Sequence, residues 1–512
     1  MTRSANPTTK AGRSPAKNAG RSSENGAPST RASSTTPEWV RDAVFYQIFP
    51  DRFASSRAVS KPRHLEPWDS PPTEHGFKGG DLLGIVEHLD YLQDLGITAL
   101  YLNPIFLSAA NHRYHTYDYY HIDPLLGGDA AFRTLLDEAH RRNMRIVLDG
   151  VFNHASRGFY QFHHLLENGA ASPYQDWFII NSWPLYAYDN TRPPNYAAWW
   201  GLRALPKFNI ATPAVREFLL GAARYWVEQG TDGWRLDVPG EITDESFWRE
   251  FRCQVKEANP DAYIVGEIWH EAQRWLQGDQ FDAVMNYLFT KACLAFFASR
   301  DLNLALTSGV GYYPVEPVGA EGFAAAIHHL LGLYSPQVTQ VQMNLLDSHD
   351  TARFLTLARG DESALRLATL FMMCYPGAPC IYYGDEIGLE GVRDPDCRRS
   401  FPWDERRWNK GLRRYVQRCI ALRKAHPALR RGEFQTLLAQ GDVYALGRQL
   451  AGETVICVLN GGTQPWNLNV PLRGYLPEGA VLQGAWDEGT ATVRNGALTG
   501  LSVPSRTGLV LA

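Results

Sequence analysis

Four acidic residues, each at the end of a short apolar run, are the residues of this sequence best suited to chemistry. They are Asp149, Asp237, Glu267 and Asp350. An ionised carboxylate is costly to bury without a partner, so buried strands rarely end in one unless the group is used. Four of them at strand-like ends therefore indicate one shared polar cleft. Their residue type predicts acid chemistry in that cleft.

The composition argues against several other classes of protein. The chain has 512 residues, 45% of them hydrophobic, and its net charge of −4 gives no electrostatic reason to expect a nucleic acid partner. Its seven cysteines are scattered without a C-x-x-C pair, which disfavours a zinc site and a disulfide framework. The most apolar stretch, residues 367–383, is interrupted by two prolines and a glycine and is too short to span a membrane.

Alternating helices and strands must position the acids. Helical spacing of apolar residues covers 81–95, 130–142, 213–229 and 244–258, and the strand-like runs that follow are 97–102, 145–148, 233–238 and 263–265. Thr212 and Asp244 stand where helix N-caps are expected, and Gly230 stands where the third helix should stop. Apolar strands without alternation are typical of a parallel sheet covered by helices.

The spacing of the strands decides between an open sheet and a barrel. The separation of Asp237 and Glu267, roughly 30 residues, is about the length of one β-α-β unit, so they should end adjacent strands. Eight strands are expected, near residues 44, 99, 146, 234, 263, 283, 342 and 380. An α/β fold of the (β/α)8 TIM-barrel type has its active site at the carboxyl ends of the strands, where all four acids fall. An open sheet would need a glycine-rich loop after the first strand, and residues 50–53 lack one.

The chain divides into five segments. Residues 1–36 have six Lys or Arg against one Glu and almost no large apolar residues, which predicts a disordered tail. The barrel is expected over 37–153 and 210–429, with an irregular lobe, 154–209, inserted after the third strand. Alternating strands predict a C-terminal antiparallel β-sandwich at 430–512. The tail could also suggest an organelle transit peptide. It lacks the apolar core of a secretory signal, which excludes a secretory signal more firmly than a transit peptide. We predict a cytoplasmic protein.

Four motifs around the acids resemble the signature regions of the α-amylase family, glycoside hydrolase family 13, and occur in the family's order. They are Asp149–His154, Gly233–Asp237, Gly266–His270 and Ser348–Asp350. Residues 205–209, Leu-Pro-Lys-Phe-Asn, resemble a fifth region of the neopullulanase, cyclomaltodextrinase and maltogenic amylase subfamily. Residues 278–287 are similar to that subfamily as well. The resemblance extends from about Val44 to the C-terminus.

The resemblance implies roles for three acids in retaining glycoside hydrolysis, which uses a carboxylate nucleophile and a protonated carboxyl. Asp237 would be the nucleophile, Glu267 the general acid and base, and Asp350 a group that binds sugar hydroxyls and stabilises the transition state. Arg235, on the same face of its strand, would keep Asp237 ionised by charge pairing. A less polar setting near Trp269 and nearby negative charge would help Glu267 to retain its proton.

Other residues are expected to contact the sugar. Tyr114 would stack on it, His154 and His349 would donate hydrogen bonds to its hydroxyls, and Glu241 would lie on the acceptor side. The predicted substrate-binding residues are Tyr114, His112, His154, Arg235, His349, Trp269 and Glu241. The alternative for Tyr114 is plain packing in the core, and the alternative for the histidines is a core imidazole whose hydrogen bonds are satisfied within the protein. Asp149 is kept out of the catalytic set, as a support bonded to Arg235.

The sequence also departs from the subfamily. Subfamily members usually have an N-terminal β domain that shapes a dimer, whereas we expect only the tail before Trp39 here. Their common dimer is therefore not assumed, and the oligomeric state is open. Gly240 precedes Glu241 where Asn is common, which leaves transglycosylation open. The loop that often binds calcium after the first strand reads Ala-Ser-Ser-Arg-Ala-Val at 54–59, with few hard oxygen ligands. Asn153 binds calcium in some branches of the family. We therefore leave calcium open, although we expect that no cofactor is required.

The predicted function is retaining hydrolysis of α-1,4 bonds in cyclomaltodextrins, maltooligosaccharides, pullulan or starch through a covalent glycosyl-enzyme. An α-1,6-glucosidase or a glucanotransferase is the alternative, because the same carboxylates serve all three. From other classes, a metal-dependent barrel hydrolase could use the Asp and His residues as ligands. A non-catalytic barrel, like the amylase-like heavy chains of amino-acid transporters, would be expected to have a membrane helix and eroded acids.

Overall fold

The computed structural model describes residues 36–472, 474–486 and 489–512. The predicted disordered tail, 1–36, lies outside the described residues except for Thr36. No helix in the described part of the chain is both long and apolar enough to cross a bilayer. The cytoplasmic location stays a prediction.

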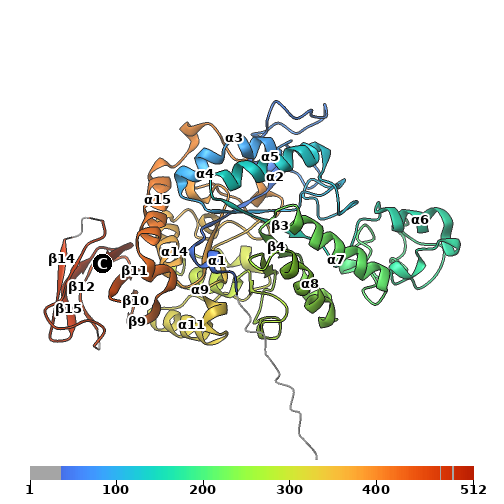
Figure 1. Cartoon of the computed structure of the whole chain (residues 1–512). Coiled ribbons are helices and arrows are strands. Elements are labelled where there is room, and N and C mark those ends of the chain that lie inside the picture. The colour runs from blue at the N-terminus through green and yellow to red at the C-terminus, as the bar shows by residue number, and fades with distance from the viewer. Residues whose placement is uncertain (1–35, 473, 487–488) are drawn as a thin grey trace, which may run out of the picture. The chain divides into compact units, whose positions relative to one another are not determined.

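A parallel sheet of eight strands closes into a barrel (Figure 1). The strands are β1 Phe45–Ile48, β2 Ala99–Leu102, β3 Arg145–Gly150, β4 Gly233–Leu236, β5 Tyr263–Gly266, β6 Ala283–Val284, β7 Met343–Leu345 and β8 Ala378–Tyr382. Their order is β6-β5-β4-β3-β2-β1-β8-β7, and a parallel bridge between Met285 and Met343 joins the two ends. Every residue of β1, β2, β4 and β5 is buried, because the helices cover the barrel outside and side chains fill it inside. The predicted barrel is confirmed.

The barrel helices differ from the prediction in one place. The helix expected over 81–95 is two helices, α3 Leu82–Glu87 and α4 Leu89–Leu95. His88 separates them: its Nδ1 lies 2.8 Å from the carbonyl oxygen of Gly84, and its ring packs 3.6 Å from that of Trp403. The apolar spacing continues across this break, so the pattern alone did not reveal it.

The other predicted helices are α5 Gly128–Arg141, α7 Pro213–Glu228 and α8 Glu245–Ala258. Asp244 caps α8 by accepting a hydrogen bond from the amide of Ser246. Thr212 stands at the N-cap of α7, but its hydroxyl donates to the carbonyl oxygen of Asp176 instead. The remaining helices are α1 Glu38–Asp42, α2 Pro50–Phe53, α9 Tyr287–Phe297, α10 Leu304–Thr307, α11 Ala320–Gly332, α12 Pro336–Thr339, α13 Phe354–Leu357, α14 Glu362–Cys374, α15 Lys410–Ala425 and α16 Pro427–Arg431.

The chain between β3 and α7 is largely irregular, as expected. It contains the helix α6 Tyr160–Asn168, short 3-10 turns and isolated antiparallel bridges, among them those of Phe178 with Phe208 and of His154 with Lys207. Stacked and edge-on aromatic rings, not a sheet, hold this lobe together, as with Phe178 and Phe208 at 5.5 Å between centroids. The limits 154–209, like the other domain limits, stay a prediction.

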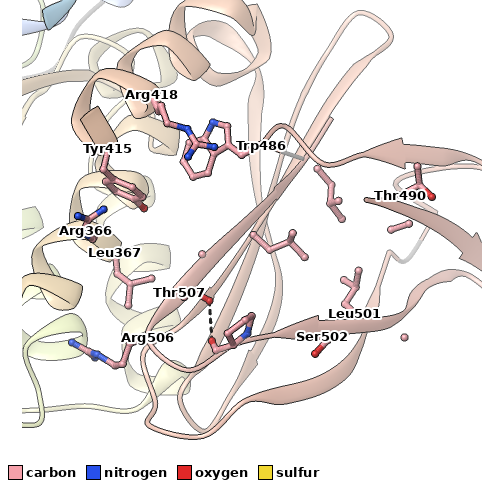
Figure 2. A pocket seen from close by; sticks show the side chains of 16 residues that line it. Arg366, Leu367, Tyr415, Arg418, Trp486, Thr490, Leu501, Ser502, Arg506 and Thr507 are labelled. Carbon is pink, nitrogen blue, oxygen red and sulfur yellow. Dashed lines mark hydrogen bonds between the residues drawn. The ribbon is translucent and has the colours of Figure 1, made fainter. Parts of the chain in front are cut away.

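The C-terminal part forms two four-stranded antiparallel sheets, with orders β16-β11-β10-β9 and β12-β15-β14-β13. Their strands are β9 Glu433–Gln440, β10 Val443–Leu450, β11 Glu453–Asn460, β12 Trp466–Pro471, β13 Val481–Gln483, β14 Thr490–Arg494, β15 Ala497–Val503 and β16 Thr507–Leu511. A cavity of about 680 Å³ lies where they meet α14 and α15 (Figure 2). At its edge the guanidinium of Arg418 covers the indole of Trp486 at 4.7 Å, and Tyr415 meets that indole edge-on at 5.7 Å.

Candidate active site

A cleft of about 1940 Å³ opens at the carboxyl ends of the barrel strands. Nine of the ten predicted site residues line it, namely Asp237, Glu267, Asp350, Tyr114, His112, His154, His349, Trp269 and Glu241. The tenth, Arg235, is fully buried beneath them. The structure therefore brings together side chains that are far apart in the sequence, from His112 to Asp350.

The pairing of β4 and β5 places two of the acids side by side. Leu236 is in register with Gly266, so Asp237 and Glu267 follow at equivalent positions, and the amide of Glu267 donates to the carbonyl oxygen of Leu236 at 3.0 Å. Neighbouring strands lie about 4.7–4.9 Å apart. The two carboxyl groups therefore leave adjacent strand ends and face the same cleft.

Arg235 is the cation shared by these acids. Its Nη1 donates to Asp149 Oδ1 at 2.8 Å and to Asp237 Oδ1 at 3.2 Å. Its Nη2 lies 2.9 Å from Glu267 Oε2, a charge contact without the alignment of a hydrogen bond. One guanidinium thus compensates three buried carboxyls.

Charge pairing alone does not keep Asp237 ionised, contrary to the sequence prediction. Burial raises the pKa of Asp237 well above its usual range, and the neighbouring carboxylates add to this rise although Arg235 opposes it. Burial likewise raises the pKa of Glu267, again against Arg235. The prediction was incomplete because it gave Arg235 a single partner, whereas the fold makes it divide its charge among three.

Burial and the charge of Asp350 raise the pKa of Glu267, in the predicted direction, whereas the indole of Trp269 itself lowers it. Its indole N–H donates to Glu267 Oε1 at 2.9 Å, a contact that favours the ionised form and lowers the pKa. The indole is held by a parallel stack on Tyr287, with 3.6 Å between ring centroids. Burial, not the tryptophan, is what helps Glu267 to retain a proton.

The backbone at Val238 also holds Glu267. The amide of Val238 donates to Glu267 Oε2 at 3.0 Å. Val238 has a φ of 36°, a left-handed conformation that is strained for a β-branched residue. This strain lies directly after Asp237 and points a backbone donor at the neighbouring carboxyl.

His349 connects Asp350 to the far wall of the cleft. Its Nδ1 accepts from the side-chain amide of Gln47 at 2.9 Å, so with the amide in this orientation the imidazole carries its proton on Nε2. That nitrogen faces the hydroxyl of Tyr114 at 2.6 Å and Asp350 Oδ2 at 3.1 Å. Burial, Arg398 and Arg235 lower the pKa of His349 well below its usual range, so the ring is neutral.

Asp149 is the most enclosed of the four acids. Besides Arg235, it accepts hydrogen bonds from the hydroxyls of Tyr101 and Tyr114, both at 2.8 Å. The expected bond between Asp149 and Arg235 is present. Asp149 does not line the cleft, which fits a supporting position.

The remaining predicted residues also line the cleft. His112 Nδ1 accepts from the amide of Tyr114 at 3.2 Å. His154 stacks on Trp199 at 5.3 Å, and burial lowers its pKa to about 3, so this imidazole is neutral. Its Nε2 has no hydrogen-bond partner in the described part of the protein. Glu241 pairs with Lys207 at 2.9 Å.

Two cleft residues, Arg398 and Trp200, escaped the sequence prediction, as did Lys207, which pairs with the cleft residue Glu241. Arg398 donates to Asp350 Oδ1 at 3.2 Å and to the carbonyl oxygen of His349 at 2.8 Å. Arg398 follows β8, and its position after the last barrel strand is the sequence feature that could have identified it as a cleft residue. Lys207 was quoted only as part of a motif. Trp200, exposed at the cleft and stacked on Trp199 at 4.6 Å, had no sequence signal beyond its type.

Asn153, the residue that some branches of the family use for calcium, has a buried side-chain oxygen without a partner among the described residues. The described chain contains no group of three or more His, Cys, Asp or Glu side chains that could hold a metal ion.

Comparison with known proteins places this geometry in a family. Residues 47–419 match the model of the alpha amylase catalytic domain, and residues 434–508 match that of the neopullulanase-like C-terminal domain. The chain is 47% identical to neopullulanase 2 of Thermoactinomyces vulgaris over 86% of this chain and 73% of the relative. It is 46% identical to the cyclomaltodextrinase of Geobacillus thermopakistaniensis, over 85% and 71%.

A solved structure shows the same fold over nearly its whole length. The debranching enzyme of Nostoc punctiforme aligns with a TM-score of 0.86 and 48% identity, covering 93% of this chain and 99% of that one. The match of fold, catalytic domain and C-terminal domain leaves one conclusion. The chain belongs to the α-amylase family, glycoside hydrolase family 13, and is an α-glucan hydrolase.

Proposed function

We propose that this protein hydrolyses α-1,4-glucosidic bonds with retention of configuration, with Asp237 as nucleophile and Glu267 as general acid and base. The observation that carries the proposal is the pair of carboxyls at equivalent ends of β4 and β5, both contacting Arg235 and both facing the cleft. Retaining enzymes need the two carboxyls about 5–5.5 Å apart, and inverting enzymes about 6.5–9.5 Å. Adjacent strand ends, spaced by about 4.7–4.9 Å, support the shorter separation.

In the first step Glu267 gives its proton to the glycosidic oxygen while the Asp237 carboxylate attacks the anomeric carbon. The bond to the leaving sugar breaks, and a glycosyl ester forms on Asp237. In the second step Glu267, now ionised, takes a proton from water, and the water oxygen displaces Asp237. Burial raises the pKa of both carboxyls, which favours retention of a proton in the pair. We assign that proton to Glu267, so that Asp237 acts as the ionised nucleophile.

The surrounding residues are proposed to bind and orient the sugar. Asp350 would accept hydrogen bonds from sugar hydroxyls. The neutral His154, whose Nδ1 accepts from the side-chain amide of Asn153 at 3.1 Å, would donate to a hydroxyl from its unpaired Nε2. Tyr114 lies parallel to His349, with 5.5 Å between ring centroids and 7° between planes, and would offer its ring to the apolar face of a glucose. Glu241, held by Lys207, would contact the acceptor side.

The substrates proposed are cyclomaltodextrins, maltooligosaccharides, pullulan and starch, in keeping with the names of the neopullulanase and cyclomaltodextrinase relatives. An α-1,6-glucosidase is the second candidate, favoured by the likeness to a debranching enzyme. A glucanotransferase of the same family would use the same carboxylates with a sugar in place of water.

Product analysis separates these functions. The protein is incubated with a cyclodextrin, pullulan, starch and maltotriose, and the products are identified by chromatography. Panose from pullulan and linear maltooligosaccharides from the cyclodextrin are expected for α-1,4 cleavage. Maltotriose from pullulan would instead establish α-1,6 cleavage, and products longer than the substrate would establish transfer. The first product formed should be the α-anomer by NMR; a β-anomer would refute retention.

The nucleophile is tested by Asp237→Asn, which removes the charge but keeps the shape of the side chain. We expect kcat to fall by roughly a thousandfold or more, because the covalent step is lost. The matched control is Asp137→Asn on the exposed face of α5, which should be as active as the parent. Equal rates for Asp237→Asn and the parent would refute the assignment.

A further inference from the structure

A lysine ammonium lies at the loop that follows β1 and α2. The carboxylate of Asp81, fully buried at the N-cap of α3, accepts from the amide of Gly84 at 2.7 Å through Oδ1. Its Oδ2 accepts from the amide of Ser56 at 2.8 Å and lies 2.7 Å from Lys61 Nζ. Both carboxylate oxygens are therefore engaged by donors from residues 54–61 and from the first turn of α3.

Lys61 joins a third segment to this contact. Its Nζ also donates to the carbonyl oxygen of Leu125 at 3.2 Å, in the 3-10 turn Pro124–Leu126, and its side chain is only 17% exposed. A carboxylate and a backbone carbonyl thus converge on one positive charge. Hard metal cations gather oxygen ligands in the same way, but here the positive charge belongs to the chain.

The residues of this loop do not fit calcium, the metal that the family resemblance left open for it. Calcium takes six to eight oxygen ligands, whereas residues 54–60 contain neither Asp nor Asn. The hydroxyl of Ser56 donates to Glu87 at 2.5 Å and is already used. A second cation next to the Lys61 ammonium would also be repelled.

We propose that the ammonium of Lys61 is the structural cation of this loop, in place of a bound calcium ion. It anchors the segment between Lys61 and Asp81, whose middle carries Glu74 and His75 to the wall of the cleft. The far end of that segment is held independently by Asp51, which accepts from the amides of Lys78 at 2.9 Å and Gly79 at 3.1 Å. At the near end, Lys61 contacts Asp81 and Leu125.

The test combines a chelator with the variant Lys61→Met, which keeps the alkyl stem and removes the charge. Melting temperature and hydrogen–deuterium exchange of residues 54–61 are measured for both proteins with excess EDTA and with calcium chloride. For the parent we expect neither EDTA nor calcium to change either quantity. Lys61→Met should melt lower by about 2 °C or more, because it leaves the buried Asp81 carboxylate without its cation, and should exchange faster in 54–61.

Lys410→Met is the matched control, since it breaks an exposed pair with Glu405 at 2.8 Å and should leave the melting temperature unchanged. Faster exchange of 54–61 in the parent on adding EDTA, reversed by calcium, would overturn the proposal. So would a Lys61→Met protein that matches the parent in both measurements. Neither readout uses catalysis, so the result stands whether or not the proposed function is correct.

Discussion

At the scale of single residues, the site is a balance of charges around one arginine. Arg235 contacts Asp149, Asp237 and Glu267, and a second guanidinium, Arg398, contacts Asp350. Four buried or half-buried carboxyls therefore face two cations, and the deficit favours keeping a proton in the cleft. Each donor aimed at Glu267 then adjusts how firmly that proton is held.

The variant Trp269→Phe removes one such donor. The indole N–H favours ionised Glu267, so its loss should raise the pKa of Glu267 further. Because the acid must be protonated to act, the alkaline limb of the kcat/KM profile should move to higher pH. We also expect kcat/KM at neutral pH to fall about tenfold, corresponding to one hydrogen bond to a charged group.

The measurement is the pH dependence of kcat/KM from acid to alkaline. Trp39→Phe serves as the control, because Trp39 donates to the carbonyl oxygen of Asp261, outside the cleft. An alkaline limb that stays in place or moves to lower pH in Trp269→Phe would contradict the role given to this contact.

At the scale of elements, the spacing of β4 and β5 sets the geometry of the two carboxyls. Gly233 begins β4 with a φ of 155°, and a Cβ there would meet the backbone oxygen of Tyr263 in β5 at 2.2 Å. Glycine is thus required for the close approach of the two strands. Asp237 and Glu267 lie at the far ends of these same strands.

Gly233→Ala should therefore push β4 away from β5. We expect a loss of stability of about 3 kcal/mol or more from the clash and the strained φ. Where the protein still folds, kcat should fall about a hundredfold, as a displacement near 1 Å misaligns the carboxyls. Urea denaturation and steady-state kinetics give the two values.

The matched change is Gly332→Ala in the last turn of α11, where an added Cβ meets no atom within 4 Å. It should be neutral or stabilising by up to about 1 kcal/mol, since alanine is the better helix former. If Gly233→Ala behaves like Gly332→Ala, the strand spacing does not depend on this glycine.

Across the molecule, the buried Arg448 ties a C-terminal sheet to the barrel, and the buried Arg423 shares one of its acceptors. Arg448 of β10 donates to the carbonyl oxygens of Cys374, Leu429 and Gly432 at 2.6–2.9 Å. Arg423 of α15 donates to the carbonyl oxygen of Leu429 as well and to others near the end of α14. Burial lowers the pKa of Arg423 to about 9 and that of Arg448 to about 10, so both stay charged near neutral pH.

Arg448→Met should loosen this connection. It leaves three buried carbonyl oxygens without that donor, and we expect a cost of about 3 kcal/mol or more in the free energy of unfolding. KM should not change, because Arg448 does not line the cleft. Arg406→Met, at a side chain 89% exposed, is the control and should unfold like the parent in urea. An unchanged unfolding midpoint for Arg448→Met would contradict the role of the buried guanidinium.

Local sequence patterns were enough to predict most helices and strands and the set of acids. Apolar runs without alternation predict buried parallel strands. Asp237 and Glu267 are separated by the length of one β-α-β unit, which predicts that they end neighbouring strands. Both signals are local, because periodicity and β-α-β length depend on residues close together in the chain. The apolar spacing did not predict the break in the helix at His88. There the ring of His88 packs on Trp403, which lies roughly 300 residues later in the sequence.

How the acids and arginines share their charges could not be predicted without the folded structure. From the sequence, Arg235 had one partner and Trp269 was an apolar neighbour, whereas the fold gives the arginine three carboxyls and turns the indole N–H toward Glu267. Likewise, Arg398 pairs with Asp350 and Lys61 with Asp81, and the two partners of each pair are well separated in the chain. Burial and hydrogen bonding fix a pKa, and both depend on groups that meet only when the barrel closes.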